Sequence, residues 1–303
     1  MKEKLLKLDT FTLKIIAIIS MTISHISLFL VSANIISNDV NFILQIFGRI
    51  AFPLFVFTLY VGLLHTRNIK KYLLRLGTSA AIIWAGLAII NSPLFGLPSY
   101  ISRMMMNIGN IFLDLFLIAL SYFLFIQKNK FIKALAILPF LYAIGCAFFK
   151  YYNYEFINDF HFLYDGFLLQ YDRLGFLLFW LFYLFINLYN KNIKIGLNND
   201  ESLISAYKET YEYKFRRNLI CCISIVLVSI ICYFIDVATR NTLVSSRIMD
   251  FGCESYLVLA GIFVLFYNWK PGLKNNFSKY FFYLYYPGHI LIIFLVYYLC
   301  FLI

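Results

Sequence analysis

The chain has 303 residues, of which 62% are hydrophobic and only 14% are charged. A soluble domain typically has roughly 45–50% apolar and about 25% charged residues, so this composition excludes an ordinary soluble domain and indicates an integral membrane protein. The formal net charge of +11 would suggest a nucleic-acid partner in a soluble chain. In a membrane protein the positive-inside rule accounts for it, and we expect no nucleic-acid partner.

Nine apolar runs have the length that a bilayer-spanning helix needs, about 17–25 residues. They cover approximately residues 11–32, 42–64, 72–92, 107–126, 131–149, 167–190, 219–238, 249–268 and 281–303. The runs are continuous rather than alternating, which argues against a β-barrel. We predict an all-α fold, a polytopic transmembrane helical bundle of about nine helices that forms a single domain over residues 1–303.

The connections between these runs differ in charge. If the runs cross the membrane in turn, 20 of the 26 Lys and Arg residues fall on one side and four on the other, while Arg49 and Arg173 lie inside spans. Cytoplasmic connections carry the excess of basic residues. We therefore expect the N-terminus in the cytoplasm and the C-terminus outside, in a multi-pass protein of a bacterial cytoplasmic membrane with the lipid bilayer as a partner.

Two connections are long enough to carry features of their own. The connection 191–217 is expected in the cytoplasm, where Asp200 and Glu201 can start a short helix that continues toward Arg217. The connection 150–166 is expected outside, and it carries four ionisable residues, Glu155, Asp159, His161 and Asp165.

Three ionisable side chains lie deep in the predicted spans. With a rise of about 1.5 Å per residue, His25 lies about 21 Å from the cytoplasmic edge and Arg49 about 10 Å from the outer edge, so they are level in a core about 30 Å thick. Asp114 is expected at a similar depth and Glu254 somewhat shallower. An isolated charge there is costly, and a guanidinium cannot lose its proton. We therefore expect a polar cavity that opens outward.

Other interpretations of these groups stay open. Arg49 and Asp114 can form an ion pair that holds helices together, and His25 can be a neutral histidine hydrogen-bonded across helices. His289 lies near mid-membrane after Tyr286-Pro287-Gly288, where packing and function are equally compatible with the sequence.

Familiar motifs of soluble enzymes are absent. The sequence has no Gly-x-Ser-x-Gly, no phosphate-binding glycine loop and no His-Glu-x-x-His. The six cysteines lie in or beside apolar runs without a Cys-x-x-Cys pair, so we expect buried packing residues and no metal site.

Four segments carry a resemblance to a known family. They are LKIIAIISMTISHIS, IFGRIAFPLFVFTLYVGLLHTRNIKKYLLRL, NIGNIFLDLFLIAL and YFFYLYYPGHILIIFL. Together they resemble the TraX family of polytopic membrane proteins. The resemblance covers both ends and much of the first half of the chain, and it is weak over about 130–250. The run GRIAFP with the following HTRN and YLLRL is its most specific part.

The resemblance implies acetyl transfer. TraX proteins are associated with acetylation of conjugative pilin, and they are similar to membrane acyltransferases that take acetyl-CoA from the cytoplasm and modify an acceptor at or beyond the membrane. On this resemblance His25 is the general base and Arg49 stabilises the developing oxyanion or holds the pantetheine arm. The cytoplasmic cations would bind the phosphates of the acyl donor acetyl-CoA: Arg67, Lys70, Lys71 and Arg75.

The chain departs from the family pattern at three acidic positions. Ser24 stands before His25 where the family usually has Asp, Val61 replaces a Glu, and Trp84-Ala85 replaces Ser-Glu. A base histidine normally needs an acceptor on its other nitrogen. Ser24 lies about 100° around the helix from His25, so we expect Asp114 to supply that role from another helix.

Two other classes of function remain compatible with the sequence. An outward polar cavity suits a transporter or flippase, although no matching pair of broken helices indicates inverted repeats. A catalytically inactive TraX-like membrane scaffold would explain the missing acids. The acyl acceptor itself can be a peptide amine, a surface glycan or a small molecule.

An acetyltransferase of this topology needs a path for its donor. A charged nucleotide does not cross the hydrocarbon core, so the pantetheine arm must thread between helices. Its extended length of roughly 15–20 Å nearly matches the depth of His25. We predict a narrow channel from the cluster Arg67–Arg75 to His25 and Arg49, with Gly48, Gly62 and Gly109 leaving space between helices and a separate outward cavity for the acceptor.

Overall fold

The structure is a computed structural model, and it describes residues 5–90, 92, 109–152, 167–239, 251–273 and 275–301. Within these residues the regular elements are helices, and one isolated β-bridge joins Leu8 to Tyr267. The helices are α1 (Thr10–Ser32), α2 (Asn38–Gly48), α3 (Ala51–His65), α4 (Ile69–Ile90), α6 (Ile111–Phe125), α7 (Lys130–Ala134), η3 (Leu135–Ile137), α8 (Leu138–Tyr152), α10 (Asp172–Gly196), α11 (Glu201–Glu209), α12 (Tyr211–Thr239), α14 (Phe251–Glu254), η5 (Ser255–Val258), α15 (Leu259–Leu265) and α16 (Asn276–Phe301).

The predicted all-α bundle is confirmed. Among the described residues, seven helical stretches are long and apolar enough to cross a membrane. The two remaining predicted runs correspond to the shorter apolar helices Ile111–Phe125 and Ser255–Leu265. Each of the nine apolar runs in the sequence therefore contains helix, as its length and composition require.

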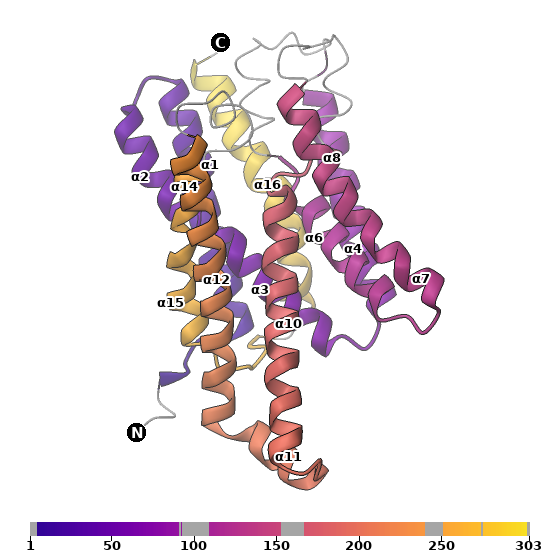
Figure 1. The fold of residues 1–303 in the computed structure, drawn as a ribbon. Helices are drawn as coiled ribbons and strands as arrows, with labels where there is room; N and C mark the ends of the chain where they lie inside the picture. Colours follow the sequence, from indigo (N-terminus) through magenta and orange to yellow (C-terminus); the bar gives the residue numbers. More distant parts are fainter. Residues whose placement is uncertain are drawn as a thin grey trace.

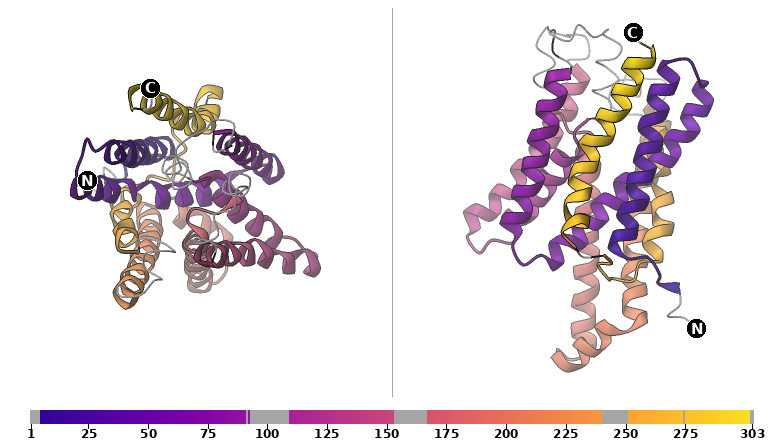
Figure 2. Two further views of the ribbon diagram at one scale, coloured as in Figure 1. Left: turned by 90° about the horizontal axis from the view of Figure 1, so that it is seen from above. Right: turned by 180° about the vertical axis from the view of Figure 1, so that it is seen from behind.

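Successive long helical stretches of the bundle run in opposite directions, with α2 and α3 forming one stretch (Figures 1 and 2). α1 begins at the lower end in Figure 1, and α16 ends at the upper end. The connections that follow α3, α6, α10 and α15 all lie toward the lower end, together with the start of α1. These are the basic connections of the sequence, so the structure gathers them on one side. Most of the predicted outer connection 150–166, with His161, lies outside the described residues.

The second apolar run lies in one candidate membrane span, Asn38–His65, as predicted for residues 42–64. The helix is interrupted within it, between α2 and α3, at Arg49 and Ile50. Pro53 supplies the physical reason, because a proline has no N–H to bond the carbonyl of residue 49 and its ring crowds that carbonyl. Arg49 therefore lies at the end of α2, at an interruption inside the span.

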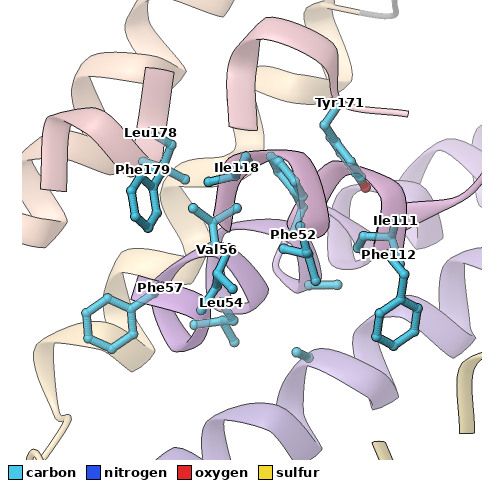
Figure 3. Packing of buried hydrophobic residues seen from close by; sticks show 14 of the residues in the cluster. Phe52, Leu54, Val56, Phe57, Ile111, Phe112, Ile118, Tyr171, Leu178 and Phe179 are labelled. Atoms are coloured by element: carbon cyan, nitrogen blue, oxygen red, sulfur yellow. The ribbon is translucent and has the colours of Figure 1, made fainter. Parts of the chain in front are cut away.

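α3 forms the centre of the bundle. Ten of the eleven residues from Ala51 to Val61 are buried, and the helix contacts α1, α6, α10 and α15. Figure 3 shows the side chains of Phe52 and Val56 beside Ile118 of α6 and the aromatic residues of α10. The Phe52 ring stacks on Tyr171, with a centroid distance of 3.6 Å and an interplanar angle of 5°. The apolar character of α3 on all sides is what a central helix requires.

The long connection before α12 contains the short helix α11, as predicted. Asp200 caps this helix by accepting from the N–H groups of Ser202 and Leu203. The Ser202 hydroxyl also donates to this carboxylate, and these hydrogen bonds lower the pKa of Asp200. The helix ends at Glu209 rather than continuing to Arg217, because Thr210 adopts an extended backbone and α12 begins after it.

α1 and α2 approach closely at a glycine. A Cβ atom on Gly48 would overlap the Ser24 side chain. The expectation that Gly48 leaves open space is therefore wrong at this position, because Ser24 fills it. Gly109 has a φ of +66°, which favours glycine, and lies against the Gln170 side chain.

We expect Gly48→Ala to destabilise the bundle by about 1–3 kcal/mol, because the added methyl group forces α1 and α2 apart. The control is Gly86→Ala in α4, where an added Cβ meets no atom within 4 Å. Unfolding of both variants in detergent gives the comparison. Equal stability of the two variants would contradict the close contact at Ser24.

Candidate functional site

His25 lies in the interior against the last helix. It projects from α1, is 6% exposed, and its Nδ1 atom lies 2.8 Å from Nε2 of His289 on α16. Nδ1 of His289 lies 2.9 Å from the Tyr285 carbonyl oxygen. The two imidazole rings are nearly parallel, with an interplanar angle of 7°. The partner of His25 is therefore a second histidine from the opposite end of the sequence.

Arg49 has an acidic partner, but it is not Asp114. Its Nη1 atom lies 2.9 Å from Oε1 of Glu254 in α14, and Nε donates to the Cys253 sulfur at 3.4 Å. Glu254 is 2% exposed and Arg49 is 18% exposed, so the pair is largely shielded from solvent. The proposed pairing of Arg49 with Asp114 is thus replaced by one with Glu254, which the sequence had placed at a shallower depth.

Asp114 binds the backbone before α10. One carboxylate oxygen accepts from the N–H of Gln170 at 2.9 Å and the other from Tyr171 at 3.1 Å. The carboxylate therefore holds the turn that carries Tyr171, whose ring stacks on Phe52. The structure gives His25 a partner other than the expected Asp114, so we assign Asp114 a supporting position beside the site.

His25 and Arg49 lie at the same level, as the depth estimate predicted. Gly48, next to Arg49, packs on Ser24, next to His25. The Ser24 hydroxyl donates to Oε1 of Gln45 at 2.7 Å, and the Gln45 amide returns a hydrogen bond to the Ser24 carbonyl at 2.9 Å. These bonds fix α2 on α1 and hold the two functional side chains in register.

A cavity of about 70 Å³ lies between α1, α3, α4, α6 and α16. Lys14 and Ile18 line it from α1, and Tyr286 lines it from α16. The Tyr286 ring lies edge-on to His25, with a centroid distance of 6.1 Å. Lys14, Ile18, Met21 and His25 share one face of α1, and the rise along the helix axis from Lys14 to His25 is about 16 Å. Lys14 therefore lies on the cavity wall, and His25 lies behind the Tyr286 ring that also lines it.

Two cations lie at the Lys14 end of this cavity. The Lys14 ammonium lies 5.2 Å from the centre of the Phe282 ring, and the Arg75 guanidinium lies 5.5 Å from that of Tyr72. Nε of Arg75 is buried without a hydrogen-bond partner. In the part of the chain that the structure describes, neither cation has a carboxylate partner. This end of the cavity is therefore suited to an anion.

The predicted basic cluster is only partly gathered at the cavity. Arg75 contacts the cavity wall, whereas Arg67, Lys70 and Lys71 are exposed at the turn between α3 and α4. Lys14 was not predicted as a cofactor-binding residue. Its signal in the sequence is its spacing, because Lys14 and His25 differ by about three helical turns and so share a face.

The sequence singled out His25 and Arg49 but did not identify the partner of either residue. His289 and Glu254 were noticed as ionisable groups inside apolar runs, which is the signal that could have found them. Their pairing depends on which helices are neighbours, and residue depth alone does not give it. Tyr286 carried no signal of its own, since aromatic residues fill many helix contacts in this chain.

The fold and these polar groups define a multi-pass helical membrane protein with an ionisable site in its interior. The family model for the TraX protein matches residues 9–195. The chain therefore belongs to the TraX family. Comparisons with curated proteins and with solved structures find no match for it. The matched range contains His25, Arg49, Asp114 and the basic turn, while His289 and Glu254 lie beyond it.

We expect removal of either partner of the Arg49–Glu254 pair to destabilise the protein by about 3–5 kcal/mol, because the other charge is left buried. The double variant Arg49→Leu/Glu254→Leu should recover most of this loss. Unfolding in detergent measures the three free energies. Additive losses in the double variant would show that the pair does not hold α2 against α14.

The control for this series is Arg216→Met, which breaks an exposed pair with Glu212 on α12, Nη2 to Oε1 2.6 Å. Exposed pairs contribute little to stability because solvent screens them. The free energy of unfolding of Arg216→Met should match that of the wild type.

Proposed function

We propose that this protein is a membrane-embedded acetyltransferase that moves an acetyl group from cytoplasmic acetyl-CoA to an acceptor amine or hydroxyl at or beyond the outer face. Membership of the TraX family, which is associated with pilin acetylation, supports this reaction class. The single observation that carries the proposal is the cavity lined by Lys14 and by Tyr286, whose ring packs on the buried His25.

The shape and charge of the cavity suit one part of the donor. It is narrow and mostly apolar, with Lys14 on its wall, so it suits a slender chain rather than a nucleotide. The length of the α1 face, about 16 Å, lies within the roughly 15–20 Å reach of an extended pantetheine arm. Lys14 and Arg75 would hold a phosphate group of acetyl-CoA at the entrance. Arg67, Lys70 and Lys71 would attract the nucleotide from the cytoplasm.

The chain's own residues supply the proton transfer and the charge stabilisation. Acetyl-CoA contributes the activated acetyl thioester. His25 accepts the proton of the acceptor N–H or O–H as that atom bonds to the acetyl carbon. Arg49 stabilises the negative charge that develops on the carbonyl oxygen, and its contacts with Glu254 and Cys253 keep it oriented. As the carbon–sulfur bond breaks, His25 returns the proton to the departing thiolate.

The three missing family acids do not argue against activity at this site. Ser24 is used to hold α2 through Gln45, and Val61 is buried in the apolar core around α3. The third position is Ala85, and Trp84 beside it packs on Phe167 with a centroid distance of 5.0 Å. The orienting acceptor that His25 requires is present in His289, which weighs against an inactive scaffold.

Transfer across the membrane without chemistry, as in a transporter or flippase, is the competing function. A transporter of an unrelated solute would not be stabilised by CoA. An acetyltransferase would be, since a ligand that binds the folded state raises the unfolding temperature. Thermal unfolding of the purified protein with and without CoA separates the two functions.

We expect His25→Ala to lose acetyl transfer by a factor of about 10²–10⁴, because a positioned general base contributes that much. Purified protein in lipid, supplied with radiolabelled acetyl-CoA and a peptide or amine acceptor, gives the rate. The variant should retain the wild-type unfolding temperature shift with CoA. Unchanged activity in His25→Ala would overturn its role as the base.

Filling the cavity should block the donor. Ile18→Trp places a large ring in the cavity wall, so we expect the KM for acetyl-CoA to rise at least about tenfold, equivalent to about 1.4 kcal/mol. The matched control is Ile19→Trp, because Ile19 is the next residue on α1 and is 54% exposed. If Ile18→Trp and Ile19→Trp bind CoA equally well, the pantetheine arm does not use this cavity.

A further inference from the structure

The hydrogen bonds of the histidine pair determine where its protons lie. Nδ1 of His289 lies 2.9 Å from the Tyr285 carbonyl oxygen. A carbonyl oxygen can only accept, so Nδ1 of His289 must carry the hydrogen. A neutral imidazole has one N–H group, and Nε2 of His289 is therefore an acceptor.

The same reasoning gives the tautomer of His25. Its Nδ1 atom lies 2.8 Å from Nε2 of His289. Because that atom accepts, Nδ1 of His25 must donate, and the ring's other nitrogen, Nε2, is left with a free lone pair. One backbone carbonyl on α16 thus sets the tautomer of both rings.

The surroundings favour the neutral form of the pair. His25 and His289 are 6% and 7% exposed. Among the described residues, neither imidazole has a carboxylate contact. A charged ring in such a place would be costly.

Neighbouring contacts hold His289 in this orientation. Its ring stacks on Tyr285, with a centroid distance of 5.0 Å and an interplanar angle of 15°. The Thr22 hydroxyl donates to the Ile18 carbonyl, so the Tyr285 hydroxyl, 2.8 Å away, donates to Thr22. This bond joins α16 to α1 one helical turn from His25.

We propose that His289 is a positioning residue that fixes His25 as the Nδ1–H tautomer, so that Nε2 of His25 is the atom that accepts the acceptor's proton. The inference rests on the proposed function of His25 as the general base. It assigns to a neutral histidine the orienting role that a carboxylate has in many catalytic histidine sites. During transfer Nε2 gains the acceptor's proton and later returns it to the thiolate, while Nδ1–H continues to donate to His289.

The tautomer can be measured without any acetyl transfer. Protein labelled with ¹⁵N-histidine in lipid has four histidines, and the signals missing from His25→Asn identify His25. We expect protonated Nδ1 and unprotonated Nε2 for His25 in the neutral form. His65 is an internal reference, because its Nδ1 atom lies 2.9 Å from the Val61 carbonyl and must also be protonated.

Two substitutions at His289 test the cause. His289→Gln keeps an acceptor oxygen for His25, so its Nδ1–H tautomer should persist, whereas His289→Phe removes the acceptor and should restore the Nε2–H form. An Nε2–H signal for His25 in the wild type would overturn the inference whatever the enzyme's activity. If the proposed function fails instead, the protein will transfer no acetyl group, although His25 still shows the predicted Nδ1–H tautomer.

Kinetics give the second readout. We expect His289→Phe to lower kcat at least tenfold with the KM for acetyl-CoA within twofold of wild type, and His289→Gln to recover most of the loss. Phe29→Leu is the control, since it removes a ring contact between α1 and α16, with Tyr297 at a centroid distance of 5.2 Å, without touching the histidines. Equal losses in His289→Gln and His289→Phe would contradict the positioning role, as would a wild-type kcat in His289→Phe.

Discussion

The structure depends on keeping one guanidinium in the interior of an apolar bundle. The Arg49 guanidinium stays protonated, so the fold must place an acidic side chain beside it. Pro53 interrupts the second apolar run at this point, and Arg49 lies at the break. From there it reaches Glu254 in α14. The pair therefore joins the N-terminal half of the chain to its C-terminal half, and the position of α14 beside α2 follows from it.

The histidine pair of the proposed site also joins the two ends of the chain. His25 and His289 come from α1 and α16, and the segments that precede these helices are also paired: Leu8 donates to the Phe266 carbonyl and Thr10 to the Lys270 carbonyl. Fixing the start of α1 against the connection before α16 sets the relative height of the two helices. The bond between the rings at 2.8 Å requires that register, since a shift of one helical turn is about 5.4 Å.

The sequence predicts the helices and the depth of their polar residues, because both follow from hydrophobic length and the rise per residue. It therefore placed His25 level with Arg49. It does not predict which helices are neighbours, and for that reason it offered Asp114 rather than Glu254 as the partner of Arg49. The choice depends on packing around α3, where Phe52 stacks on Tyr171 and fixes α10 and its preceding turn. Asp114 is used to bind that turn. Pro53 is present in the sequence, but the length of the apolar run around it led us to expect an uninterrupted helix.

The direction of the Ser24 side chain bears on the missing family acid. Ser24 lies on the face of α1 that meets α2, where it donates to Gln45 and packs on Gly48. A carboxylate at this position would therefore project toward the end of α2, close to Arg49, rather than toward the ring of His25. Its natural partner would be the guanidinium, as Glu254 is in this chain. An acid at position 24 is thus a separate requirement from the hydrogen-bond acceptor that His25 needs for its Nδ1–H group. An uncharged histidine at position 289 supplies that acceptor without adding a charge to the interior.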